Sequence, residues 1–183
     1  MVGLVKIAER LDPDMTALTF AVATAEDAAE IAALRNAAAE RLTRDYGPGH
    51  WSYLGTERGV LNDLRKPKFS RILLARRAGR IVATLRLATK KPWAIDTAYF
   101  SPVKRPLYLV GMAVHPAAQR KGFGRRILQE AIRAAKDWPA DAIRLDAYDA
   151  AAGAGPFYAK CGFREVGRAS YRNTPHIYYE MVL

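Results

Sequence analysis

The feature that most restricts the fold of this sequence is the junction at residues 107–137, where an apolar segment runs through a short basic turn into an amphipathic segment. Residues 107–114 (LYLVGMAV) form an apolar run typical of a buried strand, and Gly111 within it predicts a bulge or the close approach of another backbone. Residues 122–137 predict a helix that ends at Trp138-Pro139. Its apolar face consists of Ile127, Leu128, Ala131, Ile132 and Ala135. A strand, a turn and a helix in this order indicate an α/β fold.

The turn between these two segments has the properties of a phosphate-binding site. The first amides of a helix have no intrahelical acceptor and lie at the positive end of the helix dipole. Gly122 and Gly124 remove side chains that would hold a diphosphate away from those amides. Four cations and no acid lie nearby: Arg120, Lys121, Arg125 and Arg126. The P-loop and dinucleotide-fold glycine patterns are absent. The alternative is a basic loop that merely begins a helix.

The rest of the chain alternates between short strand and helix patterns. A strand is expected at 18–23, followed by a helix from Thr24 to about Leu42 with Ile31, Leu34, Ala38 and Leu42 on one face. Further helices are expected at about 57–65 and 155–160, and further strands at 71–78, 80–88, 142–148, 163–170 and 177–182. Residues 90–106, with three prolines, form a long loop of the kind that is often functional. We therefore expect an N-terminal extension at 1–17 and a single mixed α/β domain at 18–183.

Composition restricts the function further. The 183-residue chain has one cysteine, Cys161, and three separated histidines, so neither an internal disulfide nor a metal site is indicated. No apolar run reaches the ~20 residues of a membrane span, and acids near the N-terminus argue against a secretory signal, which predicts a cytoplasmic protein. The net charge is +11, with eleven cations and one acid between Arg58 and Lys91. Such a segment is either a solvated surface or a region that attracts a nucleotide or a nucleic acid.

Two motifs resemble those of one known family. QRKGFG at 119–124 matches the Q/R-x-x-G-x-G/A signature of the GNAT acetyltransferase superfamily, and FYAKCGF at 157–163 resembles that family's FYxKxGF segment. The order of the expected elements is also similar over residues 18–183. The resemblance implies a mixed, largely antiparallel sheet of about seven strands with flanking helices. It also implies an N-acetyltransferase that transfers an acetyl group from acetyl-CoA to a primary amine in a ternary complex.

The resemblance assigns acetyl-CoA to particular positions of this sequence. The backbone of Met112, Ala113 and Val114 would pair with the pantetheine arm, and the turn would hold the diphosphate through Gln119, Arg120, Lys121, Gly122, Phe123, Gly124 and Arg125. One departure is Ala151, which stands where the family commonly has an asparagine. The resemblance implies no metal.

The transfer requires a neutral amine, an oxyanion donor and an acid for the departing thiolate. An amide near residues 112–114 is the candidate oxyanion donor. Tyr158 is the candidate acid, because tyrosine stays protonated at neutral pH and the family's motif tyrosine often has this role. The alternative is a tyrosine that only packs its ring. The sequence does not identify the base. Conceivable groups are Tyr108, His115, Asp146, Asp149 and His176.

The resemblance places acceptor contacts on the first two helices and on the long loop. The candidates are Trp51, Trp93, Asp96 and Tyr99, with Tyr46, His50, Tyr53 and Phe100 nearby. Aromatic rings with one acid suit a cationic amine, which is a small molecule or a protein amine. Anchoring of the loop to the core is the structural alternative. The final strands are also compatible with a homodimer.

Two other functions stay open at the level of the sequence. The first is a nucleic-acid-binding module, which rests on the basic 58–91 segment but lacks an aromatic RNA-binding motif, a helix-turn-helix pattern or zinc ligands. The second is a catalytically silent sensor that binds acyl-CoA without transferring the acyl group. Neither explains both motifs as well as an acetyltransferase does.

Overall fold

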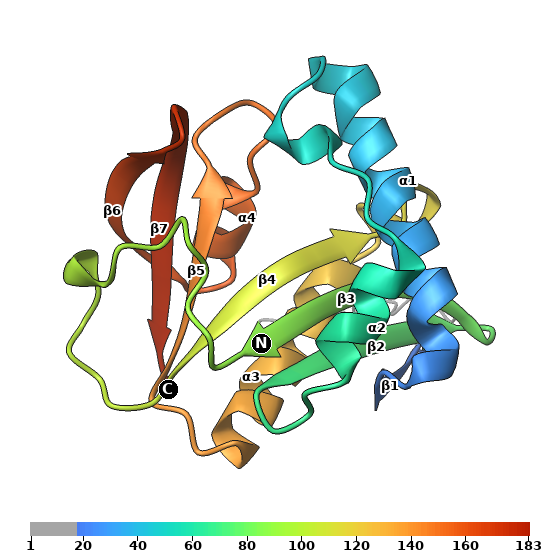
Figure 1. Ribbon diagram of the computed structural model, residues 1–183, viewed down its shortest axis with the longest axis horizontal. Coiled ribbons are helices and arrows are strands. Elements are labelled where there is room, and N and C mark those ends of the chain that lie inside the picture. Colours follow the sequence, from blue (N-terminus) through green and yellow to red (C-terminus); the bar gives the residue numbers. More distant parts are fainter. Residues whose placement is uncertain (1–17) are drawn as a thin grey trace, which may run out of the picture.

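The computed structural model describes residues 18–183. The predicted N-terminal extension, residues 1–17, lies outside the described residues. Seven strands form one sheet in the order β1-β2-β3-β4-β5-β7-β6, in which every neighbouring pair except β4 and β5 is antiparallel (Figure 1). The strands are β1 (Leu18–Val22), β2 (Ser70–Arg77), β3 (Arg80–Ala88), β4 (Pro106–Val114), β5 (Ala142–Tyr148), β6 (Arg164–Tyr171) and β7 (Thr174–Val182). The predicted mixed α/β class with a largely antiparallel sheet is confirmed.

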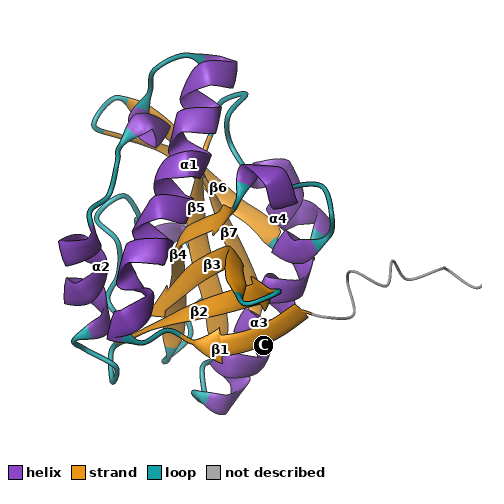
Figure 2. Cartoon of the chain, turned by 90° about the vertical axis from the view of Figure 1, so that its right-hand side faces the viewer, coloured by secondary structure: helices purple, strands orange, loops and turns teal. Residues whose placement is uncertain are grey.

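Helices cover both faces of this sheet. The helices are α1 (Ala28–Tyr46), α2 (Glu57–Leu64), α3 (Phe123–Asp137) and α4 (Gly155–Lys160). Figure 2 shows α1 and α2 on one side of the sheet and α3 and α4 on the other. None of the helices in the described range is long and apolar enough to cross a membrane.

Most predicted elements match the observed ones to within a few residues, and α1 shows why the ends differ. The sequence predicts a helix that ends near Leu42, whereas α1 continues to Tyr46. An Arg41–Asp45 ion pair at i, i+4 lies on this last turn, and the Thr43 hydroxyl donates to the Ala39 carbonyl. The helix ends at Gly47, which has a φ of +79°.

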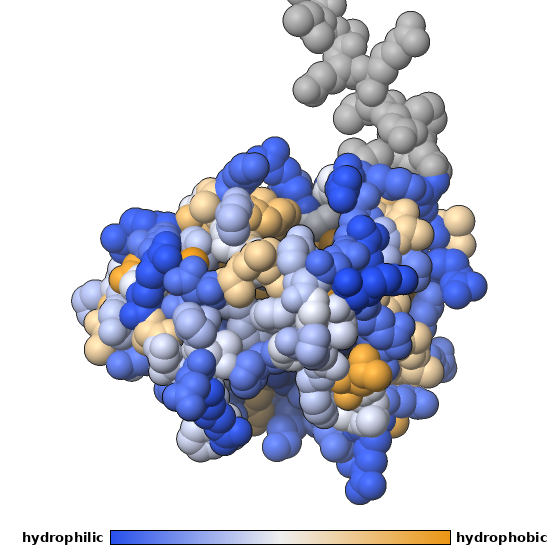
Figure 3. Space-filling view, turned by 90° about the horizontal axis from the view of Figure 1, so that it is seen from above, coloured by the Kyte–Doolittle hydropathy of each residue, from blue (hydrophilic) through white to orange (hydrophobic). Residues whose placement is uncertain are grey.

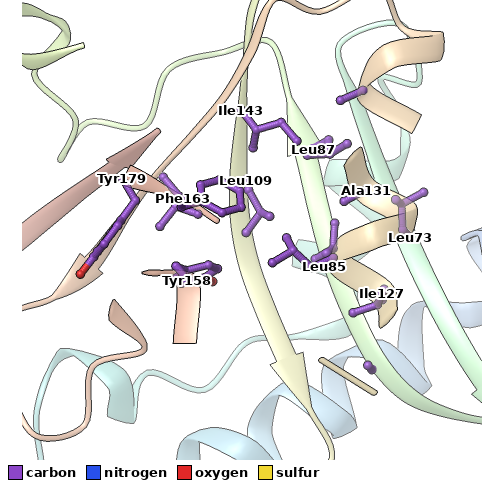
Figure 4. Packing of buried hydrophobic residues seen from close by; sticks show 14 of the residues in the cluster. Leu73, Leu85, Leu87, Leu109, Ile127, Ala131, Ile143, Tyr158, Phe163 and Tyr179 are labelled. Atoms are coloured by element: carbon purple, nitrogen blue, oxygen red, sulfur yellow. The ribbon is translucent and has the colours of Figure 1, made fainter. Parts of the chain in front are cut away.

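The main hydrophobic core lies between the sheet and helices α3 and α4. Apolar residues of β2 to β5 contact the buried face of α3, including the predicted Ile127, Leu128 and Ala131 (Figure 4). Tyr158 of α4 packs into the same core, with its ring centroid 5.8 Å from that of Phe163. The core therefore fixes the position of α4, and with it the Tyr158 hydroxyl, relative to β4.

Strands β4 and β5 separate along their length. They pair in parallel only at their beginnings, from Pro106↔Ala142 to Tyr108↔Arg144, and then diverge (Figure 1). In β4 the β3–β4 register shifts between Val110 and Ala113, and Gly111 has a φ of +60°. The bulge predicted at Gly111 is thus present. Within residues 18–183, the edge of β4 that faces β5 has no strand partner from Leu109 onward, so its backbone groups are available to a ligand.

Candidate active site

The turn before α3 has a curled backbone with unpaired amides. Arg120 and Gly122 adopt left-handed conformations, with φ values of +62° and +79°. The first intrahelical hydrogen bond of α3 is donated by the Arg126 amide to the Gly122 carbonyl. Within residues 18–183, no acceptor contacts the backbone N–H groups from Arg120 to Arg125. Successive unpaired amides in a curled backbone at the start of a helix form a concave site for an anion.

The side chains of this turn divide into two groups. Phe123 is buried in the main core, so only its backbone faces the turn, and Gln119 donates to the Val114 carbonyl at 3.2 Å. Arg120, Lys121 and Arg125 are exposed. Gly124 lies close to the strand, because a β-carbon there would be 3.4 Å from Val114 Cγ2 and 3.5 Å from Phe157 Cζ. The turn thus combines unpaired backbone amides with the exposed cations Arg120, Lys121 and Arg125.

A groove leads from this turn into the opening between β4 and β5. Its volume is about 340 Å³, and residues from β4, α1, α3 and α4 line it. Met112, Ala113 and Val114 form one wall, together with Gln119 and Gly124. Figure 3 looks onto the molecule from above, where hydrophilic residues surround a paler, partly hydrophobic centre. The groove has the extended shape and the unpaired strand edge that a flexible amide-containing arm requires.

Tyr158 lies where this groove meets a second cavity, because it lines both. The residue is 6% exposed, and its hydroxyl donates to the Met112 sulfur at 3.6 Å. Burial, with smaller effects from Asp146 and Cys161, raises the pKa of Tyr158 well above its usual value. A thioether is a weak acceptor, so this proton can be given to a better one. The geometry provides a protonated hydroxyl at the junction of the two cavities.

The second cavity has a volume of about 460 Å³ and lies between α1, β4 and β5. Trp51 lines it, as predicted, and its ring meets the Tyr148 ring edge-on with centroids 5.8 Å apart. His50 and Tyr53 line it as well. Met112 and Ala113 of β4 line this cavity as well as the groove, so the two hollows share a wall.

Asp146 is the candidate base that the structure brings to this cavity. Its carboxylate lines the wall and lies 2.7 Å from His176 Nδ1 across the β5–β7 pair. His176 is buried, with its ring centroid 5.3 Å from that of Tyr148. A buried imidazole that donates Nδ1–H holds the carboxylate in place with one oxygen still available.

The other conceivable bases are engaged elsewhere. The His115 Nδ1 accepts from the Ala117 amide, and Asp149 is bound to Arg168 at 2.9 Å. Tyr108 is buried in a separate cluster with Phe100 and Tyr178. None of these side chains lines the 460 Å³ cavity.

The structure does not bring the predicted long-loop residues to the cavity. Trp93 is 81% exposed, and the Asp96 carboxylate accepts from the Ala98 amide. Tyr99 packs edge-on against Tyr178, with ring centroids 5.4 Å apart. A buried ion pair between Glu180 and Arg144 anchors the loop, because Glu180 accepts from the Ser101 amide. A contact of Trp93, Asp96 or Tyr99 with the acceptor stays a prediction.

Sequence reasoning missed Arg35, which lines the same cavity from α1. Its position four residues after Ile31 and three before Ala38 places a cation on the apolar stripe of the helix. That interruption of the stripe was the available signal. Sequence reasoning also missed Tyr148, which lines the cavity from the end of β5. A single tyrosine at the end of a strand carries no signal that distinguishes it from a packing residue.

Several solved structures have the same fold as this chain. PaiA N-acetyltransferase from Thermoplasma acidophilum in complex with coenzyme A matches with a TM-score of 0.71 at 14% identity, over 91% of this chain and 99% of that one. The structure of YncA from Salmonella typhimurium with acetyl-CoA matches with a TM-score of 0.67 at 18% identity, over 91% and 94% of the two chains. Ribosomal-protein-alanine N-acetyltransferase from Brucella melitensis matches with a TM-score of 0.68 at 18% identity, over 90% of this chain and 99% of that one. No match to the sequence is found among curated proteins.

A family-level match to the sequence agrees with this likeness of fold. The profile of the acetyltransferase (GNAT) family matches residues 31–163, which include both motifs. The chain therefore belongs to the GNAT acetyltransferase family.

Proposed function

We propose that this protein transfers the acetyl group of acetyl-CoA to a primary amine, directly and within a ternary complex. The observation that carries the proposal is the continuity of three features: the unpaired amides at 120–125, the groove along β4, and the cavity beyond Tyr158. The groove connects the turn with the acceptor cavity, and the two hollows meet at the Tyr158 hydroxyl. This arrangement suits an acetyl donor and an amine acceptor that are bound at the same time.

The residues present fit acetyl-CoA, which supplies an activated thioester to the amine. The diphosphate would be held by the amides from Arg120 to Arg125 and by the flanking cations, since six unpaired N–H groups otherwise lack an acceptor. The unpaired edge of β4 at Met112 to Val114 would hydrogen-bond the pantetheine arm. A β4 amide near the bulge would also stabilise the negative charge that develops on the acyl oxygen.

Asp146 and Tyr158 take the two proton-transfer roles in this proposal. Asp146 accepts a proton from the ammonium form of the acceptor, and His176 positions its carboxylate through the 2.7 Å hydrogen bond. Tyr158 gives its proton to the departing thiolate, which is a stronger acceptor than the Met112 sulfur that it now contacts, and the resulting tyrosinate takes up the second proton that the acylated nitrogen loses. The raised pKa keeps Tyr158 protonated at neutral pH, as an acid requires.

The direct experiment is to incubate the protein with acetyl-CoA and a library of amines. Thiol release is followed by absorbance, and acetylated products by mass spectrometry. We expect amine-dependent thiol release with a product 42 Da heavier than the acceptor (about the mass of an acetyl group less one hydrogen), and intersecting double-reciprocal plots. Tight acetyl-CoA binding with no product from any amine would contradict the proposal and favour a silent sensor, whereas parallel plots would contradict the ternary complex.

A further inference from the structure

One arginine that lines the acceptor cavity has two buried nitrogens without a hydrogen-bond partner in residues 18–183. Arg35 of α1 lines the cavity with its guanidinium over Gly111 of β4, where a β-carbon would be 3.4 Å from Arg35 Nη2. Both Nε and Nη2 are buried, and neither has a hydrogen-bond partner within the described residues. These two atoms lie on the same edge of the guanidinium. That edge is the one that binds a carboxylate through two parallel hydrogen bonds.

The protein itself does not neutralise this charge. Asp63 acts electrostatically on Arg35, but its carboxylate is bound to Arg86 at 2.5 Å. Burial lowers the pKa of Arg35, Asp63 raises it, and Arg86 lowers it again. Two guanidinium groups therefore share one carboxylate, and the group of three carries one excess positive charge. A buried charged donor without an acceptor is costly, and a ligand that supplies the acceptor would remove that cost.

Asp146 provides a charge of the opposite sign on another wall of the same cavity. Arg35 projects from α1, Asp146 projects from β5, and β4 with its bulge lies between them. The cavity thus has a positive wall and a negative wall, with the Tyr158 hydroxyl at its junction with the groove. A zwitterionic molecule matches this arrangement, because its ammonium group would lie toward Asp146 and its anionic group toward Arg35.

We propose that the acceptor is a small amino acid-type molecule, in which a carboxylate bound by Arg35 accompanies the amine that is acetylated. This inference rests on the proposed function and names its substrate class. A carboxylate is favoured over a phosphate because its single charge balances the single excess charge, and its planar shape fits the unpaired guanidinium edge. Binding through this edge requires the Arg35 side chain to turn toward the cavity, because Nε and Nη2 are shielded from water in the unliganded structure. The 460 Å³ volume and the aromatic wall of Trp51 and Tyr148 suit a molecule of this size with an apolar side chain.

The kinetic test compares acceptors that differ only in the carboxylate. L-Leucine and L-phenylalanine are each compared with the corresponding amide and decarboxylated amine, and with the aminophosphonate analogue. For the wild type we expect kcat/KM to be about 10- to 100-fold higher with the amino acid than with its amide, mainly through KM. Arg35→Gln should abolish that preference, so that the amino acid, its amide and the decarboxylated amine have similar kcat/KM values. Arg35→Lys keeps the charge and should retain part of the preference.

Three results would overturn the proposal. The first is equal acetylation of amino acids and their amides by the wild type. The second is an Arg35→Gln variant that loses activity equally toward all acceptors, which would indicate a structural role. The third is a clear preference for the aminophosphonates, which would reassign the site to phosphoryl groups.

A binding measurement separates the failure of this inference from the failure of the proposed function. N-Acetyl-L-leucine and N-acetylisoamylamine are compared as ligands by thermal denaturation, in the presence of coenzyme A. Stabilisation by the carboxylate compound alone, absent in Arg35→Gln, would support the carboxylate site even if no amine were acetylated. Turnover of amines without any such difference would leave the enzyme activity intact and contradict the role of Arg35.

The stability of the unliganded protein gives a further readout. Arg35→Met replaces an unpaired buried cation with an apolar side chain of similar length, so we expect Tm without ligand to rise by several degrees. An arginine with a structural role predicts the reverse. A lower Tm in Arg35→Met would therefore contradict the absence of a protein partner on which the inference depends.

Discussion

At the scale of single residues, the proposed chemistry depends on hydroxyl and carboxylate groups that the fold holds at one point. The Tyr158 hydroxyl has only a weak sulfur acceptor, and Asp146 is held by an imidazole on the neighbouring strand. Each group has a nearby counterpart of the same type that does not line the cavities. These counterparts, Tyr179 and Asp149, serve as controls.

The first prediction concerns Tyr158. Tyr158→Phe removes the proton donor and keeps the ring in the core, so we expect kcat to fall about 10²-fold while the KM for acetyl-CoA changes little. Tyr179→Phe removes a buried hydroxyl whose ring centroid is 6.2 Å from that of Tyr158, and it should keep kcat within about two-fold. Steady-state kinetics with both variants checks the role. Equal turnover by wild type and Tyr158→Phe would remove Tyr158 from the mechanism.

The second prediction concerns Asp146. Asp146→Asn keeps the shape of the side chain and removes its basicity, so kcat/KM should fall by about 10²- to 10⁴-fold near neutral pH. Asp149→Asn, three residues further along, is the matched control, because Asp149 is bound to Arg168 outside the cavity. His176→Gln should give an intermediate loss, since it leaves the carboxylate in place but less well positioned. If Asp146→Asn and Asp149→Asn were equally active, the base would have to lie elsewhere.

At the scale of elements, the site arises from the way β4 leaves the sheet. Its pairing with β5 ends after Tyr108, and the bulge at Gly111 turns its backbone toward the opening. Strand, bulge, turn and helix α3 are consecutive in sequence. One segment of the chain therefore provides the groove wall, the candidate oxyanion donor and the anion site.

The third prediction tests the bulge. Gly111→Ala places a β-carbon at a φ of +60° and against the Arg35 guanidinium, so we expect a loss of about 1–2 kcal/mol in unfolding free energy. Gly79→Ala has the same type of backbone strain at +76° in the β2–β3 turn, with open space around the new methyl group. Chemical denaturation should show similar destabilisation for both variants. Only Gly111→Ala should also reduce kcat, by about ten-fold or more. Equal activity of Gly111→Ala and Gly79→Ala would exclude a catalytic role for the bulge.

The elements around this segment were predictable from the sequence, and the contacts across the site were not. The apolar stripe of α3, the glycines of the turn and the interruption at Gly111 are local signals, so the sequence places α3, the turn before it and the bulge at the observed positions. The Asp146–His176 pair joins residues thirty positions apart, and it depends on the β5–β7 register. Whether Arg35 has a partner depends on where Asp63 and Arg86 meet, which no local pattern specifies.

At the scale of the whole molecule, the strong positive charge is partly compensated within the fold. Several cations of the basic 58–91 segment bind acids of the domain: Arg76 binds Asp27 and Glu30, Arg80 binds Glu30, and Arg86 binds Asp63. Arg71 lies over the Trp138 ring at 4.2 Å. A nucleic-acid-binding surface would need these side chains free to contact phosphates. Their ion pairs within the domain therefore favour a structural role for the 58–91 segment.

The fourth prediction concerns the stability of the whole domain at alkaline pH. Burial raises the pKa of four tyrosines above the usual value: Tyr148, Tyr158, Tyr178 and Tyr179. The folded state therefore holds these protons more tightly than the unfolded state. The stability that this contributes is fully present below about pH 10, the unfolded pKa, and is lost as the pH rises above it. Tm should decline between pH 9 and 11, and less steeply in Tyr158→Phe. The same slope in both proteins would contradict the burial of that hydroxyl.

The proposed function depends on the backbone amides of residues 120–125 as the binding site for the diphosphate of acetyl-CoA. Isothermal titration of acetyl-CoA into three variants tests this directly. Gly124→Glu puts a carboxylate into the site, Gly124→Ala adds only a methyl group, and Lys136→Gln makes the same change of one charge unit near the other end of α3.

We predict that Gly124→Glu raises Kd about 100-fold or more through repulsion and blocked approach. Gly124→Ala should raise Kd by less than about ten-fold, because the methyl group makes ordinary contacts of 3.4 Å or longer. Lys136→Gln should bind like the wild type. If folded Gly124→Glu protein bound acetyl-CoA as tightly as Lys136→Gln, the turn would not be the diphosphate site, and the proposed function would lose its main support.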